Sequence, residues 1–190
     1  MMRPTKAELE SARSRVLRDV IEPNLGVLFC GINPGLYSGA TGHHFARPGN
    51  RFWPALFASG FTPRLLTAAE DTLLPSFACG VTNLVARTTA TADELTPDEL
   101  AGGGVRLKRT VARYRPRWAA VLGIGAYKRA FNRPAALMGP QPEPLAGARV
   151  WVLPNPSGLN ASYQLPALAR AFRDLREAAG MPVRGRPRRR

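Results

Sequence analysis

The feature that most constrains the fold is a set of four short apolar segments in which apolar and polar residues do not alternate. They span residues 26–30, 79–85, 118–122 and 149–153. Runs of this kind are typical of strands that are covered on both faces, as in a parallel sheet. Helical patterns lie between and after them, at 52–59, 98–114, 126–131 and 165–179. The order predicts an α/β fold, a three-layer sandwich with a short, mostly parallel central sheet flanked by helices.

The two ends of the chain carry separate signals. An amphipathic helix is predicted over 6–21, because Thr5 is a good N-cap and Glu8 follows three residues later. A chain of 190 residues suits one domain with a proper core. We therefore expect a single domain over 1–183 and a basic tail, RGRPRRR, over 184–190. The tail has two interpretations, nonspecific nucleic-acid attachment and a solubilising end.

The charge of the chain favours a polyanionic partner. Lys and Arg number 27 against 13 Asp and Glu, which gives a net charge of +14. Nearly all of the cations are guanidinium groups, which bind phosphate through two donors at once. Nucleic acid is therefore the expected partner, and a compositional bias toward Arg, Ala, Gly and Pro is the alternative explanation.

The sequence gives no signal for a membrane or for export. No apolar run approaches the ~18 residues that a membrane span needs, and the N-terminal stretch lacks the apolar core of a secretory signal. We expect a protein of the cytoplasm with access to the nucleoid.

Metal and cofactor sites are not expected either. Cys30 and Cys79 lie in apolar surroundings and predict buried thiols, with a disulfide as the alternative. Together with the adjacent His43 and His44 they match neither a zinc finger nor the four thiolates of an iron–sulfur cluster. The stretch GIGAYK has lysine where a nucleotide fingerprint needs its third glycine, so it predicts a tight strand-to-helix turn.

Three of the predicted strands end in turns rich in glycine and polar residues: CGINPG, GVTNLVART and VLPNPSGLN. Because the carboxyl ends of parallel strands form one rim, these turns should meet there. Asn33 in the first turn offers a carboxamide, which can hold a water or read a base edge but is not a strong general base. Its alternative role is to close an Asx-type turn before Pro34.

The segments GINPG, FARPGNRFW and LPNPSGLN, in this order, resemble the mismatch-specific uracil/thymine DNA glycosylases of the uracil-DNA glycosylase superfamily. The likeness runs over about residues 25–168 and includes CGVTNLVART and AGGGVRL. It implies a monofunctional hydrolase that flips uracil and related damaged pyrimidines out of mismatched double-stranded DNA and cuts the N-glycosidic bond, starting base excision repair. Flipping costs a few kcal/mol, least at a mismatch. From the residues alone, a non-catalytic nucleic-acid binding domain is the main alternative, and a nucleotide-binding α/β enzyme is a third.

The resemblance implies roles for residues around the first turn. Asn33 falls at the family's catalytic asparagine and would position the water that attacks C1′ of the sugar. Phe45 would stack on the flipped pyrimidine, a contact worth about 1–3 kcal/mol, whereas core packing is its other interpretation. Backbone groups of Ile32 and Ser38, with Asn83 nearby, would meet the polar edge of uracil.

The last turn carries the residues that the resemblance places against the departing base and the DNA. Asn155 would lie beside the pyrimidine O2, where negative charge builds, and Leu159 would enter the base stack as a wedge. The adjoining Ser157, Gly158 and Asn160 would contact the DNA, with Gly158 facing the widowed guanine.

Two positions depart from the family pattern. Asn160 and Ala161 stand where relatives often have an arginine, so weaker discrimination of the opposite base is expected. Asn83 stands where a lysine can occur, and a neutral amide there implies a broader range of uracil contexts.

Charged residues border the same rim. Arg47, Arg51 and Arg87 are expected phosphate contacts, with ordinary surface arginines as the alternative. Asp93, beside Glu94 in TATADELTPDEL, is predicted as an auxiliary or alternative base near the forming oxocarbenium ion. Its other interpretation is a solvated or helix-capping acid. A monomer is expected, because one enzyme engages one flipped nucleotide.

Overall fold

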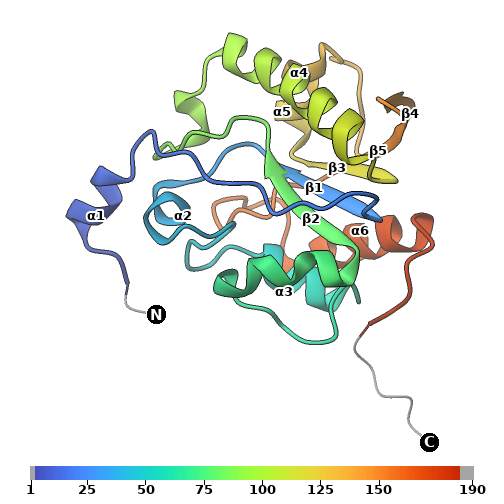
Figure 1. The fold of residues 1–190 in the computed structure, drawn as a ribbon, viewed down its shortest axis with the longest axis horizontal. Helices are drawn as coiled ribbons and strands as arrows, with labels where there is room; N and C mark the ends of the chain where they lie inside the picture. Colours follow the sequence, from blue (N-terminus) through green and yellow to red (C-terminus); the bar gives the residue numbers. More distant parts are fainter. Residues whose placement is uncertain (1–2, 185–190) are drawn as a thin grey trace, which may run out of the picture.

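The central sheet has five strands in the order β2-β1-β3-β5-β4 (Figure 1). The computed structural model describes residues 3–184. Four strands run parallel: β1 (Val27–Gly31), β2 (Cys79–Asn83), β3 (Trp118–Leu122) and β5 (Ala148–Leu153). They overlap the four predicted apolar segments, with ends that differ by at most two residues. The predicted fold class, a mostly parallel sheet between helices, is confirmed.

Helices cover both faces of the sheet. Figure 1 shows α4 (Pro97–Tyr114) and α5 (Ile124–Phe131) on one side of it, and α3 (Phe52–Ala58) and α6 (Leu165–Ala178) on the other. A 3-10 segment, η1 (Ala68–Phe77), lies on the α3 side and contacts β2.

Successive residues of β1 serve the two layers in turn. Phe29 packs in the core under α3 and α6, where its ring stacks on Phe172 at 5.6 Å between centroids. Leu28 packs on the opposite side with Leu107 of α4. All five residues of β1 are buried, because side chains of a strand alternate between faces and both faces are covered. This double coverage explains why the strands read as continuous apolar runs.

The predicted helix over 6–21 is wrong beyond its first turns. α1 spans only Lys6–Ser11, with the expected Thr5–Glu8 capping box, and Ser14 has a φ of +64°. The chain then runs extended, and Val20 exchanges backbone hydrogen bonds with Val81 of β2 at 3.0 and 2.8 Å. An uncovered strand edge leaves N–H and C=O groups without partners. Pairing with that edge stabilises this segment more than continued helix would.

A second difference is the edge strand β4 (Gly139–Leu145), which pairs antiparallel with β5. It was not predicted, because prolines at 140, 142 and 144 argue against a strand. An edge strand tolerates proline where the ring nitrogen faces away from the ladder. Two short elements beside the site, α2 (Leu36–Thr41) and η2 (Ala92–Glu94), were not predicted either.

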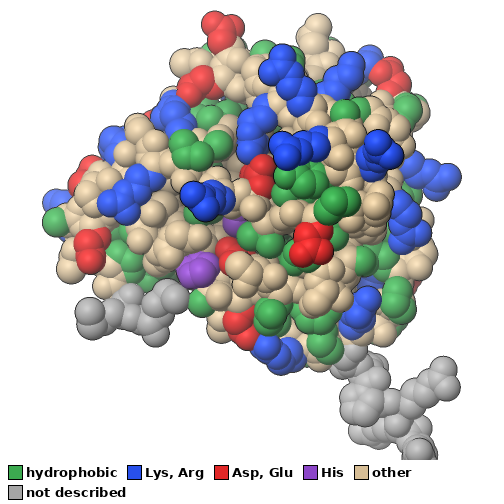
Figure 2. Space-filling model, in the orientation of Figure 1, with side chains coloured by type: hydrophobic (Ala, Val, Ile, Leu, Met, Phe, Trp, Pro, Cys, Tyr) green, Lys and Arg blue, Asp and Glu red, His purple; other side chains and the backbone are tan. Residues whose placement is uncertain are grey.

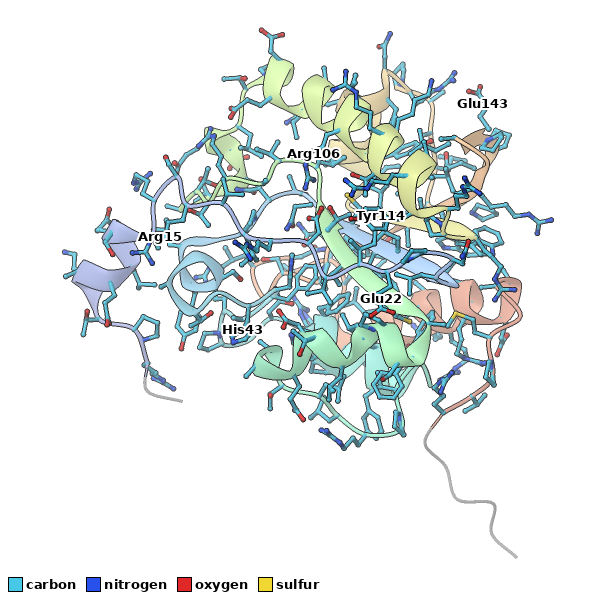
Figure 3. All side chains as sticks on the ribbon, viewed as in Figure 1. Arg15, Glu22, His43, Arg106, Tyr114 and Glu143 are labelled. Atoms are coloured by element: carbon cyan, nitrogen blue, oxygen red, sulfur yellow. The ribbon has the colours of Figure 1, made fainter. Side chains whose placement is uncertain are left out.

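A partly buried arginine network joins α4 to the N-terminal segment. Arg106, labelled in Figure 3 beneath α4, donates to Asp19 at 2.8 Å, to the hydroxyl of Thr82 at 3.2 Å and to the carbonyl oxygen of Asn83. This contact ties the end of β2 to the helix above it. Elsewhere, Lys and Arg side chains are spread widely over the face drawn in Figure 2.

Other predictions concern the cysteines and the ends of the chain. Cys30 and Cys79 are free and buried, and burial raises the pKa of both thiols. Within residues 3–184 no helix has the length and apolarity to cross a bilayer. The predicted basic tail falls at 184–190, of which 185–190 lie outside the described residues; the N–H of Arg184 donates to the carbonyl of Gly60 at 2.8 Å.

Gly102 and Gly104 of α4 give a matched pair for testing how closely α4 packs on α5. A Cβ on Gly104 would collide with the carbonyl oxygen of Ala130, whereas nothing lies within 4 Å of a Cβ on Gly102. Gly104→Ala should lower the free energy of unfolding by about 1–3 kcal/mol through overpacking. Gly102→Ala should raise it by about 0.5–1 kcal/mol, because alanine loses less backbone entropy in a helix. Chemical denaturation measures both changes, and equal stability of the two variants would contradict this packing.

Candidate active site

A cleft of about 310 Å³ opens at the carboxyl ends of the parallel strands. It lies where the strand order reverses, since the chain places β2 on one side of β1 and β3 on the other. Such switch points are the usual ligand sites of open α/β sheets. Asn33 lines the cleft after β1, Asn83 at the end of β2, Leu122 at the end of β3 and Asn155 after β5.

The cleft brings together ten of the fourteen predicted site residues. Those that line it are Ile32, Asn33, Ser38, Phe45, Arg47, Asn83, Asp93, Asn155, Ser157 and Leu159. Four are not in its lining: Arg51, Arg87, Gly158 and Asn160. Gly158 and Asn160 are the two neighbours of Leu159, which does line the cleft. Arg51 and Arg87 bind other protein groups.

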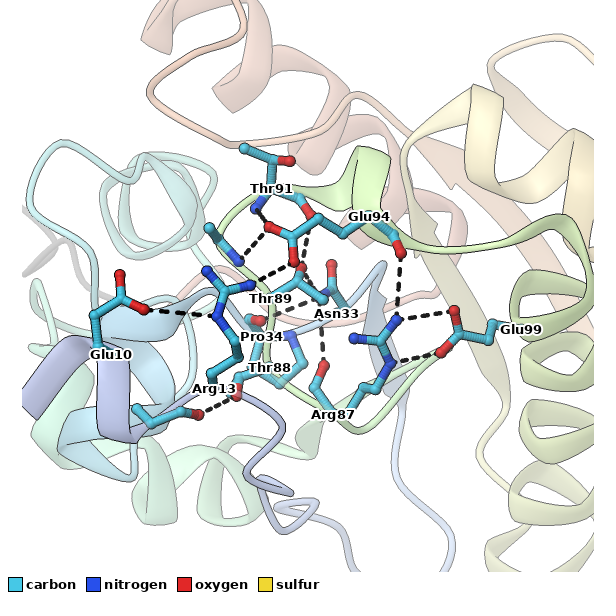
Figure 4. Close-up of polar contacts among 12 residues, drawn as sticks. Glu10, Arg13, Asn33, Pro34, Arg87, Thr88, Thr89, Thr91, Glu94 and Glu99 are labelled. Atoms are coloured by element: carbon cyan, nitrogen blue, oxygen red, sulfur yellow. Dashed lines mark hydrogen bonds and ion pairs between the residues drawn. The ribbon is translucent and has the colours of Figure 1, made fainter.

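The amide of Asn33 is held in one orientation (Figure 4). Its Nδ2 donates to the hydroxyl of Thr89 at 2.6 Å and to the carbonyl oxygens of Pro34 at 3.2 Å and Arg87 at 3.3 Å. Thr89 in turn donates its proton to the carbonyl of Thr91 at 2.6 Å, so its oxygen is free to accept from Asn33. With the nitrogen tied down, the acceptor Oδ1 is the part of the amide that remains for a ligand.

The loop between β2 and α4 holds two acidic residues, Asp93 and Glu94, and they differ in their contacts. Glu94 accepts from the backbone N–H groups of Ala90 and Thr91 and pairs with Arg13 at 2.8 Å. The hydrogen bond from Thr91 lowers the pKa of Glu94. Asp93 lines the cleft, is exposed, and has no ion-pair partner among the described residues. Its carboxylate is therefore available to the contents of the cleft.

Phe45 forms part of the wall of the cleft. One side of its ring stacks on Phe52 of α3, with centroids 4.1 Å apart. Its backbone has a φ of +53°, and the next residue, Ala46, donates its N–H to the hydroxyl of the buried Ser38 at 3.2 Å. Phe45 is thus fixed in place by aromatic packing and by α2, and it presents an aromatic surface to the cavity.

Two residues that the sequence analysis did not assign to the site, His44 and Asp71, set the orientation of Asn83. The Nε2 of buried His44 lies 2.9 Å from the carbonyl oxygen of Arg18, which can only accept, so Nε2 carries the proton. Its Nδ1 then accepts from Asn83 Nδ2 at 3.4 Å. Burial lowers the pKa of His44, and the buried Asp71 accepts from its backbone N–H at 3.0 Å.

This arrangement decides which atom of Asn83 a ligand would meet. With Nδ2 directed at His44, Oδ1 lies against Gly31 at the floor of the cleft. No described residue donates a hydrogen bond to that oxygen. The adjacent histidines in GHHF, next to a matched segment, were the available sequence signal for this network, and nothing in the sequence linked Asp71 to it.

Asn155 begins the loop that carries Leu159. Its Oδ1 accepts from the N–H of Ser157 at 3.0 Å, and its carbonyl accepts from Asn160 Nδ2 at 2.9 Å. The remaining part of the Asn155 amide, the donor Nδ2, has no hydrogen-bond acceptor within the described part of the chain. Leu159 stands at the tip of the loop with 70% of its surface exposed.

The three rim arginines differ in what they bind. Arg47 is exposed, lines the cleft and has no acidic partner in residues 3–184. Arg87 forms two hydrogen bonds with Glu99, at 2.5 and 2.9 Å, and this contact lowers the pKa of that carboxyl to about 2. The pair therefore persists down to acidic pH and is lost only as the pH falls toward that value. Arg51 binds carbonyl oxygens of the 155–163 loop.

Chemically, the cleft suits a flat polar ring beside a bound water. Neutral amides dominate its polar groups, an aromatic ring forms one wall and a single carboxylate lies at its edge. Within residues 3–184, no group of three or more His, Cys, Asp or Glu side chains is placed to share a metal ion. The groups present can align a water and stabilise charge, but no strong nucleophile is among them.

Comparison with known proteins agrees with this geometry. The sequence profile of the uracil DNA glycosylase superfamily matches residues 18–176. A solution NMR structure of a candidate uracil DNA glycosylase from Methanosarcina acetivorans has a TM-score of 0.52, with 16% sequence identity over 85% of this chain and 98% of that one. At this identity the structural likeness shows the fold alone. Because the profile covers most of the sequence, the chain belongs to the uracil DNA glycosylase superfamily.

Proposed function

We propose that this protein is a monofunctional DNA glycosylase that removes uracil from mismatched duplex DNA, G·U pairs above all. Membership of the superfamily supports a uracil-DNA glycosylase that hydrolyses N-glycosidic bonds. The observation that carries the finer proposal is that one cleft contains the Asn33 amide, the Phe45 ring and the exposed Leu159 tip. These three groups must lie close together if Phe45 is to stack on the flipped base, Asn33 to hold the attacking water and Leu159 to enter the DNA stack.

The flipped uracil would lie against Phe45 with its polar edge toward Asn83. The free Oδ1 of Asn83 would accept from N3–H of the base, which uracil and thymine carry and neutral cytosine lacks. The carbonyl of Ile32 already accepts from the N–H of Val85 at 2.9 Å. The backbone groups of Ile32 and Ser38 that would meet the base are therefore their N–H donors, which would bind its oxygens.

Hydrolysis would proceed with little covalent help from the protein. Asn33 Oδ1 would accept a hydrogen bond from a water and so direct a lone pair of the water oxygen at C1′ as the bond to the base lengthens. The free Nδ2 of Asn155 would donate to O2 of the departing base, where negative charge collects. Asp93, as auxiliary or alternative base, would stabilise the positive sugar and take the proton that the water loses.

Preference for a mismatch would come from the cost of flipping. Leu159 would fill the vacated space, with Ser157, Gly158 and Asn160 against the DNA, and a weak pair would open at the lowest cost. Since Asn160 and Ala161 stand where relatives often have an arginine, discrimination of the opposite base would be weaker. Arg47 remains our phosphate contact, whereas Arg51 and Arg87 are engaged by protein partners.

We propose further that the catalytic unit is the single domain 1–183, acting as a monomer in a compartment with access to chromosomal DNA. The competing proposal is a nucleic-acid binding domain without activity. It would need the charge of the chain but not a fixed amide orientation at Asn33. A gel assay for alkali-labile product from G·U, A·U, G·T and single-stranded uracil DNA distinguishes the two.

Asn33→Ala should slow single-turnover cleavage of a G·U duplex by about 100-fold or more, because the water loses its acceptor. Thr89→Val should slow it by about tenfold, the worth of one hydrogen bond that orients the amide. Binding to the same duplex, measured by fluorescence anisotropy, should change little in either variant. Unchanged cleavage by Asn33→Ala would contradict the assignment.

Asp93→Asn should slow the same reaction by about tenfold or more, because a carboxylate near the cationic sugar is lost. Asp98→Asn, an isosteric change at an exposed acid in the first turn of α4, is the matched control and should react at the wild-type rate. Equal rates for the two variants would remove Asp93 from the mechanism.

A further inference from the structure

Arg51 makes an unusual set of contacts with the loop at 155–163. Its Nη2 donates to the carbonyl oxygens of Ser157 at 2.6 Å and Asn160 at 2.8 Å, and its Nη1 donates to that of Tyr163 at 2.5 Å. Its backbone N–H donates to the carbonyl of Pro156 at 2.9 Å. Four carbonyls of one loop therefore converge on a single residue from the start of α3.

The guanidinium binds mainly this loop, and its one other hydrogen bond within residues 3–184 runs from Nη1 to Gln164 Oε1 at 3.3 Å. No carboxylate pairs with Arg51 within residues 3–184, and its Nε is buried without a hydrogen-bond partner. The side chain is thus held through its two terminal nitrogens, Nη1 and Nη2, which both bind carbonyl oxygens of the loop. A lysine could not reproduce this contact, because a compact ammonium lacks the planar fork that reaches separated acceptors.

A second contact independently joins the same two segments. The backbone of Gly158 lies so close to Gly49 that a Cβ on Gly158 would come within 2.6 Å of the Gly49 carbonyl oxygen. Inside the loop, the N–H of Leu159 donates to the hydroxyl of Ser157 at 3.3 Å, and that of Asn160 to the Ser157 carbonyl at 3.0 Å. Leu159 therefore lies in a turn that is held in place by contacts with the 49–51 segment.

We infer that Arg51 is a positioning residue that holds the 155–163 loop, and through it Leu159, in the shape that enters the DNA stack. This inference rests on the proposed function. It assigns Arg51 to the flipping step and not to a phosphate, in contrast to the expectation from sequence. Arg51 touches neither the base nor the water in this account, so the chemical step should proceed normally once the base is out of the stack.

The test compares two duplexes that differ in the need for a wedge. One contains a G·U pair, and in the other a pyrene nucleotide opposite the uracil occupies the stack and pushes the uracil out. Arg51→Lys should slow single-turnover cleavage of the G·U duplex by about tenfold or more, while the pyrene duplex reacts within about threefold of the wild-type rate. An equal loss on both duplexes, or no loss on either, would overturn the inference.

A matched control separates this effect from general destabilisation. Arg176 of α6, which is buried, likewise binds carbonyl oxygens, those of Ser59 at 2.8 Å and Met181 at 2.7 Å, and it is not in the lining of the cleft. Arg176→Lys should lower thermal stability without changing the ratio of the two cleavage rates. A change in that ratio would mean that stability alone explains the result for Arg51.

Two further variants keep the test decisive. Gly158→Ala forces the two segments apart and leaves Arg51 intact, so it should reproduce the selective loss on G·U even where Arg51→Lys folds poorly. Adding Arg51→Lys to Leu159→Ala should cause little further loss, because coupled residues are not additive. Full additivity, or a reduced salt slope of binding to undamaged duplex, would instead make Arg51 an independent phosphate contact.

The failure of this inference differs from a failure of the proposed function. If the wild-type protein cleaves neither duplex, the proposed function is wrong. If it cleaves both and Arg51→Lys matches it on both, only the positioning role is wrong.

Discussion

The parallel pairing of β1 with β2 on one side and β3 on the other brings distant parts of the chain to one rim. Gly31, the last residue of β1, is in register with Asn83, the last residue of β2, and Asn33 follows two residues beyond Gly31. β5 extends the parallel set through β3 and delivers Asn155 to the same rim. The site is therefore a consequence of sheet topology, because parallel strands must end on the same side.

The three asparagines at this rim, Asn33, Asn83 and Asn155, have neutral side chains, and each amide is held by a hydrogen bond that leaves its other polar atom free. Thr89 binds the Nδ2 of Asn33 and His44 binds the Nδ2 of Asn83, so the acceptor Oδ1 of each remains free for a ligand. Ser157 binds the Oδ1 of Asn155, so the donor Nδ2 of that amide remains free. Preorganised dipoles of this kind stabilise charge without rearranging during a reaction. An amide is otherwise free to turn, so these second partners determine what the cleft can recognise.

Much of the fold could be predicted, because the covered strands have an unmistakable apolar pattern. The segment at 15–21 could not, since its pairing with the edge of β2 depends on tertiary structure and its local pattern favours helix. β4 has a sequence that argues against a strand, because its three prolines are unfavourable in most strands and acceptable only at an edge.

For the site, the segments that resemble the family located the cleft, but not the residues that hold it. His44 and Asp71 act through contacts between residues more than 20 positions apart, as the hydrogen bond from the His44 N–H to Asp71 of η1 shows. Arg51 illustrates a different limit. Its charge and its place beside the rim suggested phosphate, whereas its partners turned out to be carbonyls more than 100 residues away. Sequence indicates the chemistry of a side chain but not which neighbour uses it.

The most direct test of the account is the structure of this protein bound to a G·U duplex whose uracil carries a sugar modification that prevents cleavage. If the proposed function is right, the uracil is extrahelical and stacked on Phe45, with N3–H directed at Asn83 Oδ1, a water at Asn33 Oδ1 and Leu159 within the base stack. A uracil that stays paired in the duplex, or that binds away from the Asn33 cleft, would contradict it.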